Sequence, residues 1–294
     1  MATPGRILVG TCNWADHKHF YPTGLPAGDR LAHYARFFPI VEVDTTFYGI
    51  PRPGVAERWL EATPPTFRFN VKAYKSLTLH ERDDGKPRPP TRAEEEDFMT
   101  LLEPMRDSAK LVGVHYQFPP WFKASPANMD FVSRLTDRHP RDQVIVEFRH
   151  ASWAEPDRFE AVTELLAESG MTYCTVDEPQ VGSATMPPHV VVTNPRLAVV
   201  RFHGQNRQKW YVKNARSSAE RFDYLYRPET LAEWVPKIRG LTLEADEVHV
   251  LFNNNRSNYA VANGLQMAQL LDLGLPSPDT VPAVIEPEQE KLPL

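Results

Sequence analysis

Eight short apolar segments recur along the chain, and each of them ends in polar or charged residues. They cover residues 7–14, 40–46, 67–73, 111–118, 143–150, 171–178, 198–204 and 247–254. Most are rich in β-branched and aromatic residues, which is typical of strands buried on both faces of a parallel sheet. The pattern therefore predicts eight strands.

Amphipathic segments with apolar residues at helical spacing separate these strands. They cover residues 29–38, 54–62, 91–107, 128–138, 157–169, 228–240 and 259–274. Several begin at Asp, Asn, Thr or Pro and end near Gly or Pro, as helix termini do. Only the segment between the sixth and seventh strands lacks a convincing helical pattern.

Strands that alternate with helices predict an α/β fold with a parallel sheet, and eight strands close a TIM barrel. We expect one (β/α)8 domain over residues 5–274. An open doubly wound sheet is the alternative, but that fold normally carries a Gly-rich phosphate turn after its first strand. Neither GxGxxG nor GxxxxGK[ST] occurs in the chain, so no nucleotide cofactor motif is present. Residues 275–294 are rich in Pro and Glu and predict an extended or disordered tail.

Composition and charge narrow the functional classes. The chain has 294 residues, 33 basic and 38 acidic side chains and a net charge of −5, which gives it no overall electrostatic attraction to nucleic acid. The absence of a long apolar run or a signal-like start predicts a cytoplasmic protein without a membrane partner. Its two cysteines lack zinc spacing and cannot form a disulfide framework. The oligomeric state stays open.

The polar residues at the strand ends carry the strongest functional signal. In a parallel barrel, side chains alternate between the interior and the exterior, and the C-terminal strand ends form one mouth. Counting back by twos from each end gives an inward polar set. It comprises Glu42, Asp44, Lys72, Gln117, Glu147, Arg149, Asp177, Arg201, His203 and Asn253 or Asn254. Buried charges persist only when they pair with one another or with a ligand, so the sequence predicts a polar pocket there.

Several residues have a simpler explanation. Gln117 and Asn253 can cap backbone amides, and Cys12 and Cys174 fit packing positions, with Cys174 expected on the outward face of its strand. His115 and His249 lie in the middle of strands, where a hydrogen-bonded core histidine is the more common situation.

The motifs resemble those of the YecE-like family, also called domain of unknown function 72. They include GTCNW at 10–14, VEVDTTFYGIP at 41–51, YQFPP at 116–120, EFRHASW at 147–153, VRFHG at 200–204 and LFNNN at 251–255. The resemblance implies a (β/α)8 barrel and supplies no secure reaction. It places the family's recurrent polar residues on Glu42, Lys72, His80, Gln117, Glu147, Arg149, Trp153, Asp177, Arg201, His203 and Asn253. The chain departs from the family at Cys12-Asn13, at residues 16–19 and at His115.

The leading hypothesis is an enzyme, a hydrolase or lyase, that acts on a small substrate bearing a phosphate or carboxylate. Glu42, Glu147, Asp177 and His203 are the candidate catalytic residues, because carboxylates and a histidine exchange protons near neutral pH. Lys72, His80, Gln117, Arg149, Arg201 and Asn253 are candidate substrate-binding residues. Arginine pairs with anions through two parallel hydrogen bonds, so we expect an anion between Arg149 and Arg201. Trp153, Tyr48, Tyr211 and Tyr224 are candidate stacking faces for a sugar or a base.

Three alternatives remain. The first is a metal-dependent phosphodiesterase acting on nucleic acid, with Glu42, Glu147, Asp177 and His203 as ligands of a divalent ion, although the nearby arginines would repel a cation. The second is a non-catalytic barrel that binds or senses an anion. The third is Schiff-base chemistry at Lys72.

Two charged segments lie near the predicted mouth. Residues 81–97 fit a solvated loop entering a helix, or a mobile lid over the pocket. Residues 205–226 contain Arg, Lys, Trp and Tyr, which fit a nucleotide contact and fit surface solubility equally well.

Overall fold

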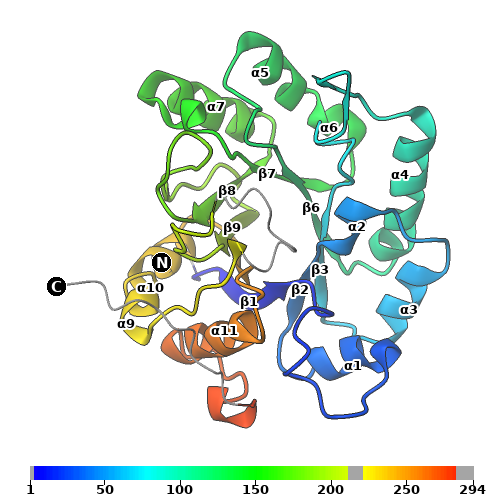
Figure 1. Cartoon of the computed structure of the whole chain (residues 1–294), viewed down its shortest axis with the longest axis vertical. Helices are drawn as coiled ribbons and strands as arrows, with labels where there is room; N and C mark the ends of the chain where they lie inside the picture. The colour runs from blue at the N-terminus through cyan, green and yellow to red at the C-terminus, as the bar shows by residue number, and fades with distance from the viewer. Residues whose placement is uncertain (1–2, 211–220, 283–294) are drawn as a thin grey trace.

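The computed structural model describes residues 3–210 and 221–282 and contains a closed barrel of eight parallel strands (Figure 1). The strands are β1 (Arg6–Cys12), β2 (Ile40–Val43), β3 (Arg68–Lys72), β6 (Leu111–Gln117), β7 (Gln143–Glu147), β8 (Thr172–Asp177), β9 (Leu197–Phe202) and β10 (Glu247–Phe252). Their order around the barrel is β1-β10-β9-β8-β7-β6-β3-β2. All eight predicted strands are therefore confirmed, and the sheet closes through six residue pairs that begin at Arg6 and Glu247.

Helices surround the barrel on its outside (Figure 1). The longer ones are α4 (Arg92–Asp107), α5 (Pro126–Ser133), α7 (Pro156–Glu168) and α11 (Tyr259–Leu270). The shorter ones are η1 (Ala27–Asp29), α1 (Arg30–Tyr34), α2 (Thr45–Tyr48), α3 (Val55–Glu61), α6 (Leu135–Arg138), η2 (Ala151–Ala154), α9 (Pro228–Ala232), α10 (Val235–Leu241) and η3 (Pro278–Thr280). Residues 178–196, between β8 and β9, contain no helix, as predicted. Among the described helices, none combines the length and apolar character needed to cross a membrane.

Local sequence explains where several helices begin. Thr91 accepts a hydrogen bond from the backbone of Glu94, and the Glu94 carboxylate accepts one from the backbone of Thr91 at 2.7 Å, which forms a capping box at the start of α4. The single helix predicted over 228–240 is divided into α9 and α10. Pro236 lies in the first turn of α10, where its missing N–H costs nothing, whereas the middle of one long helix would exclude it.

The barrel interior contains a hydrogen-bonded polar group near the N-terminal ends of the strands and charged residues towards the C-terminal ends. The outward side chains of the strands pack under the helices, as in the stacked rings of Phe202 and Phe252, whose centroids lie 4.7 Å apart. Inside, His249 lies 3.0 Å from the Asn70 amide and 2.7 Å from Glu247, so it is the hydrogen-bonded core histidine that the sequence predicts. Above that layer the interior is charged.

Candidate functional site at the barrel mouth

A cavity of about 550 Å³ opens at the C-terminal ends of the strands. Half of the predicted site residues line it, namely Tyr48, Lys72, His80, Gln117, Arg149 and Asn253. They follow or end strands β2, β3, β6, β7 and β10, so segments far apart in sequence meet at one mouth, as the barrel prediction requires.

Lys72 ends β3 and lies on the floor of this pocket. Its ammonium group donates to Gln117 Oε1 at 3.1 Å, lies 3.9 Å from Asp44 Oδ1 and sits 4.9 Å from the centre of the Phe47 ring. The residue is buried, with 8% of its surface exposed. Because a positive charge beside an aromatic face and a carboxylate is held in one position, Lys72 presents a fixed cation to the pocket.

Arg149 is the second cation of the floor. Its Nε lies 3.0 Å from Glu147 Oε1, and its Nη1 pairs with Glu178. The guanidinium carbon lies 5.5 Å from the centre of the Trp210 ring. Sequence reasoning missed Glu178 because it assigned the opposite alternation to β8 and selected the neighbouring Asp177; Glu178 shares the parity of Cys174, which lies beside Glu147. Burial raises the pKa of Glu178 to about 7, against the opposing effect of Arg149.

Arg201 lies beneath the pocket and is fully buried. Its Nη2 is 2.6 Å from Glu42 Oε1, and its Nη1 is 2.5 Å from Glu147 Oε2. Glu147 thus lies between Arg149 and Arg201 and occupies the space in which the sequence predicts an anion. That prediction is wrong, because the protein's own carboxylate pairs with both arginines.

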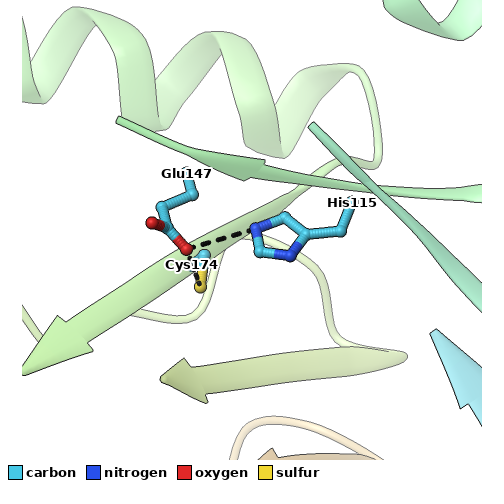
Figure 2. Close-up of side chains that lie close together, drawn as sticks. All are labelled: His115, Glu147 and Cys174. Carbon is cyan, nitrogen blue, oxygen red and sulfur yellow. Dashed lines mark hydrogen bonds and ion pairs between the residues drawn. The ribbon is translucent and has the colours of Figure 1, made fainter. Parts of the chain in front are cut away.

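His115 and Cys174 complete the buried cluster (Figure 2). Nδ1 of His115 lies 2.7 Å from Glu42 Oε2, and its Nε2 lies 3.3 Å from Glu147 Oε2. Burial is the largest single influence and lowers the pKa of His115, but the Glu42 and Glu147 carboxylates together outweigh it and the net direction is upward. His115 therefore bridges both carboxylates inside the charged cluster, which is more than the isolated core histidine predicted from its place in the strand.

Glu42 and Glu147 are the best-paired carboxylates of the barrel. Burial alone would raise the pKa of each. The positive charges together outweigh burial, namely Arg201 with His115 at Glu42 and Arg201 with Arg149 at Glu147, and they hold both pKa values well below the usual range. Neither residue lines the pocket. Their surroundings do not favour the predicted general-base role, because a base must be accessible and readily protonated.

His203 is also buried beneath the pocket. Its Nε2 lies 3.3 Å from Glu147 Oε1, and its Nδ1 lies 2.9 Å from the Asn253 amide nitrogen. Burial and the nearby Arg149 lower the pKa of His203 to about 3, so the ring is neutral near neutral pH. It positions Asn253, which lines the pocket, rather than carrying protons to a ligand.

Asp177 lies outside the barrel interior. Its carboxylate accepts hydrogen bonds from Tyr226 Oη at 2.5 Å and from Gln205 at 2.8 Å, and Tyr226 packs on the outward rings of Phe202 and Phe252. Cys174 occupies the inward face instead, 3.7 Å from Glu147 Oε2. The alternation assigned to β8 is therefore wrong by one residue, because β8 is buried along its whole length and its apolar pattern does not distinguish the two faces.

Trp153 is fully buried outside the pocket. Its indole nitrogen donates to the Phe122 carbonyl at 2.7 Å, and its ring stacks on Phe148 with centroids 4.2 Å apart. It holds the loops after β6 and β7 together and offers no stacking face to a ligand. The predicted substrate-binding role of Trp153 is not supported by this position.

Asp44 is the acidic residue at the pocket whose environment is the most unusual. It follows β2, lines the pocket, and lies 3.7 Å from Arg201 Nη2 as well as 3.9 Å from Lys72. Burial raises the pKa of Asp44 to about 7, and the neighbouring Glu42 charge adds to that rise while Lys72 opposes it. The sequence places Asp44 in the inward set, but nothing in the sequence distinguishes it from Glu42.

The buried donors do not suit a divalent cation. Within residues 3–210 and 221–282, two sets of three candidate ligands have donor atoms within 4.8 Å of one another: His115, Glu147 and Cys174, and Cys12, Glu42 and Asp44. Arg201 already bonds to a carboxylate of each set and lies 3.3 Å from Cys12 Sγ. Burial raises the pKa of both thiols, so they stay protonated. The predicted ligand set also loses Asp177, which lies outside the barrel.

Two charged segments flank the mouth. Residues 81–97 form a small antiparallel pair, β4 (Arg82–Asp83) with β5 (Lys86–Pro87), followed by the start of α4, and Arg82 packs over the pocket-lining Trp121 with 5.0 Å from guanidinium carbon to ring centre. The lid function of this segment stays a prediction. Of the segment 205–226, Trp210, Arg221 and Phe222 line the pocket, whereas Tyr211 lies outside the described residues.

Comparisons with known proteins agree with this architecture. The family profile described as "Protein of unknown function DUF72" matches residues 8–286. The chain is 35% identical over 272 residues to UPF0759 protein YunF of Bacillus subtilis, covering 91% of this chain and 95% of YunF. It is 27% identical over 252 residues to UPF0759 protein YecE of Escherichia coli K12, covering 75% of this chain and 85% of YecE.

Two crystal structures of DUF72 family proteins share the fold. One, from Thermotoga maritima, is 32% identical with a TM-score of 0.78 and covers 90% of this chain and 99% of its own. Another, from Enterococcus faecalis, is 28% identical with a TM-score of 0.83 and covers 92% of this chain and 97% of its own. With the family profile covering almost the whole barrel, the chain belongs to the YecE-like DUF72 family.

Proposed function

We propose that this barrel is an enzyme, a hydrolase or lyase, that binds a small substrate through its phosphate or carboxylate group in the mouth pocket. Lys72 and Arg149 hold the anion, and Asp44 exchanges a proton with the substrate. The observation that carries the proposal is the position of Asp44: it lines the pocket beside a fixed lysine and has a pKa raised to about 7.

The charges of the pocket favour an anionic ligand. Lys72, Arg149 and Arg221 line it together with Asp16 and Asp44. Since Asp44 is about half protonated near pH 7, its charge opposes an incoming anion less than an ordinary aspartate would. Lys72 and Arg149 are positioned before the ligand arrives, so little ordering of their side chains is needed on binding.

The buried cluster supports Asp44 from below. Arg201 keeps Glu42 ionised, and the ionised Glu42 beside Asp44 helps to raise the pKa of Asp44. Two carboxyl groups with opposite shifts in neighbouring positions provide one permanent anion and one group that changes its protonation state near neutral pH. A general acid or base works best when its pKa lies near the working pH.

Two other functions are weaker. A metal-dependent phosphodiesterase needs a cation site, and the donor sets of the described residues are already occupied by Arg201. A non-catalytic anion-binding barrel uses the same Lys72 and Arg149 and differs only in the absence of turnover. The experiments below separate it from an enzyme.

Binding is tested first, with inorganic phosphate and with acetate as probes in isothermal titration calorimetry. Lys72→Met should weaken binding of the preferred anion by about tenfold or more, because a hydrogen bond to a charged group contributes about 1.5–3 kcal/mol. Lys237→Met is the matched control, since Lys237 is exposed on the outer helix α10. An equal effect of both variants, or no binding of either anion, would refute the anion pocket.

Turnover is tested with Asp44→Asn. This variant keeps the size of the side chain but removes the exchangeable proton, so binding should persist while hydrolysis of p-nitrophenyl phosphate, or conversion of hydroxy acids, falls by about 10²-fold or more. Binding by the wild type without turnover across phosphomonoesters, phosphodiesters and hydroxy acids would identify the non-catalytic barrel. Full activity of Asp44→Asn would remove Asp44 from the mechanism.

A further inference from the structure

Aromatic rings form a continuous group on one side of the pocket. They follow three neighbouring strands: Phe47 and Tyr48 after β2, His80 after β3, and Trp121 after β6. Ring centroids lie 5.2 Å apart for Phe47 and Tyr48, 4.8 Å for Phe47 and His80, and 5.9 Å for His80 and Trp121, all edge to face. We call this group the aromatic rim.

Two further rings line the pocket from the segment after β9. Trp210 and Phe222 lie 6.0 Å apart in an edge-to-face arrangement. In the closed order of eight strands, β9 is four strands from β3 in either direction. The two sets of rings therefore follow strands on opposite sides of the barrel and line one pocket together with the cations Lys72 and Arg149.

The aromatic rim exposes apolar surface where the protein has no structural need for it. Tyr48 is 67% exposed and Trp121 is 40% exposed. An isolated exposed aromatic side chain needs no explanation. Here both side chains belong to one contiguous ring group that lines the same pocket as the fixed cations, and such a combination of apolar walls with a few fixed polar groups is characteristic of ligand sites.

Burial also keeps the rim uncharged. Nδ1 of His80 forms a hydrogen bond with Thr78 Oγ1 at 2.8 Å. Burial, together with the charges of Lys72 and Arg149, lowers the pKa of His80 to about 3. The ring of His80 is therefore neutral near neutral pH. It forms part of the uncharged wall and does not compete with Lys72 and Arg149 for the anion.

We infer that the substrate is an anion attached to a planar aromatic ring, an inference that rests on the proposed function. The phosphate or carboxylate binds Lys72 and Arg149. The ring packs between the aromatic rim and Trp210. A pocket of about 550 Å³ lies within the range that encloses a whole small molecule rather than a single anion. The rings provide affinity, and the cations provide orientation.

The test compares matched anions with and without a ring by isothermal titration calorimetry. Methyl phosphate, phenyl phosphate and cyclohexyl phosphate form one series, and acetate and phenylacetate form the other, so that the phosphate and carboxylate cases are separated. We expect the phenyl compound of the preferred series to bind about tenfold tighter than its small counterpart, since stacking on aromatic side chains commonly contributes that much.

Variants of the rim identify the source of that gain. Tyr48→Ala combined with Trp121→Ala should abolish most of the advantage of the phenyl compound. The affinity for methyl phosphate or acetate should change by less than about twofold, because Phe47 and Trp210, the rings beside Lys72 and Arg149, are left in place. Leu243→Ala is the matched control, since Leu243 is an exposed apolar side chain, 76% accessible, outside the pocket. It should leave every affinity unchanged.

The outcomes separate this inference from the proposed function. If the small anions bind and the phenyl compounds bind no tighter, the ring-bearing substrate is wrong and the anion pocket stands. If cyclohexyl phosphate gains as much as phenyl phosphate, or the double variant keeps the advantage, the planar ring or the rim is wrong. If no anion of either series binds, both proposals fail.

Discussion

Nη1 of Arg201 lies 2.5 Å from Oε2 of Glu147 at the centre of the barrel, and neither side chain is exposed to solvent. Glu42 pairs with the other terminal nitrogen of the same guanidinium. One arginine thus neutralises carboxylates from β2 and β7, on different sides of the barrel. The charged layer beneath the pocket depends on this residue.

Arg201→Met should destabilise the protein by about 3–5 kcal/mol, because it leaves two buried carboxylates without their main partner. Urea unfolding followed by circular dichroism measures the change. Arg201→Lys keeps the charge but cannot donate to both carboxylates in the same planar geometry, so an intermediate loss is expected. Arg92→Met is the control, since its pair with Glu96 is exposed on α4, and it should cost less than about 0.5 kcal/mol. Equal losses for Arg201→Met and Arg92→Met would contradict the central role of Arg201.

Asp44→Asn should make the protein more stable than the wild type at alkaline pH. The pKa of Asp44 is raised in the folded protein from 3.8 to about 7, so the wild type loses stability as the pH rises through this interval, by at most about 4 kcal/mol. Asparagine does not titrate, so the variant should lack this loss and match the wild type more closely at acidic pH. Thermal unfolding across the pH range measures the difference. If the variant is less stable than the wild type at every pH, ionisation of Asp44 in the folded protein has no free-energy cost and the prediction is wrong.

His115→Gln should flatten the pH dependence of stability at higher pH. The pKa of His115 is raised in the folded protein, so its protonated form stabilises the fold fully below about pH 6.5, the unfolded value, and this contribution is lost as the pH rises through the folded pKa. Glutamine cannot lose a proton in this range. Urea unfolding of both proteins at about pH 6 and about pH 9 should show the larger decline in the wild type. Parallel declines would mean that His115 is neutral throughout.

Trp153→Phe should lower stability without changing anion binding. The variant loses the hydrogen bond to the Phe122 carbonyl and part of a stacked core ring, which together cost about 1–3 kcal/mol. Chemical unfolding measures that loss, and calorimetry with inorganic phosphate or acetate measures binding. A loss of affinity at temperatures where the variant is fully folded would restore Trp153 as a substrate-binding residue.

Removal or addition of divalent cations should leave the thermal stability of the protein unchanged. Arg201 bonds to a carboxylate in both candidate ligand sets, and displacing it would leave a buried guanidinium without its partners. Dialysis against EDTA, followed by addition of Zn²⁺ or Mn²⁺, should not shift the midpoint of thermal unfolding. One equivalent of metal that survives purification and stabilises the fold would contradict this prediction.

The set of predicted inward residues shows which parts of the site sequence patterns can identify. Alternation along the strands correctly selects Glu42, Lys72, Glu147, Arg149, Arg201 and Asn253 as inward residues, because each strand's period of two is fixed by backbone geometry. It fails at Asp177, where both faces of β8 are apolar and carry no signal. It does not separate pocket-lining residues from buried ones, since Glu42 and Asp44 have the same chemistry and the same direction.

The sequence by itself determined the eight strands, the helices between them and the polar character of the barrel mouth, because these follow from local periodicity and from the physical requirement that apolar side chains be buried. Only the tertiary structure decided which charges meet each other and which meet the pocket. That decision depends on barrel closure, which brings Arg201 within reach of both Glu42 and Glu147. Asp44 is left facing the cavity with a raised pKa. Contacts between residues 54 and 159 positions apart set that arrangement, and no local pattern records them.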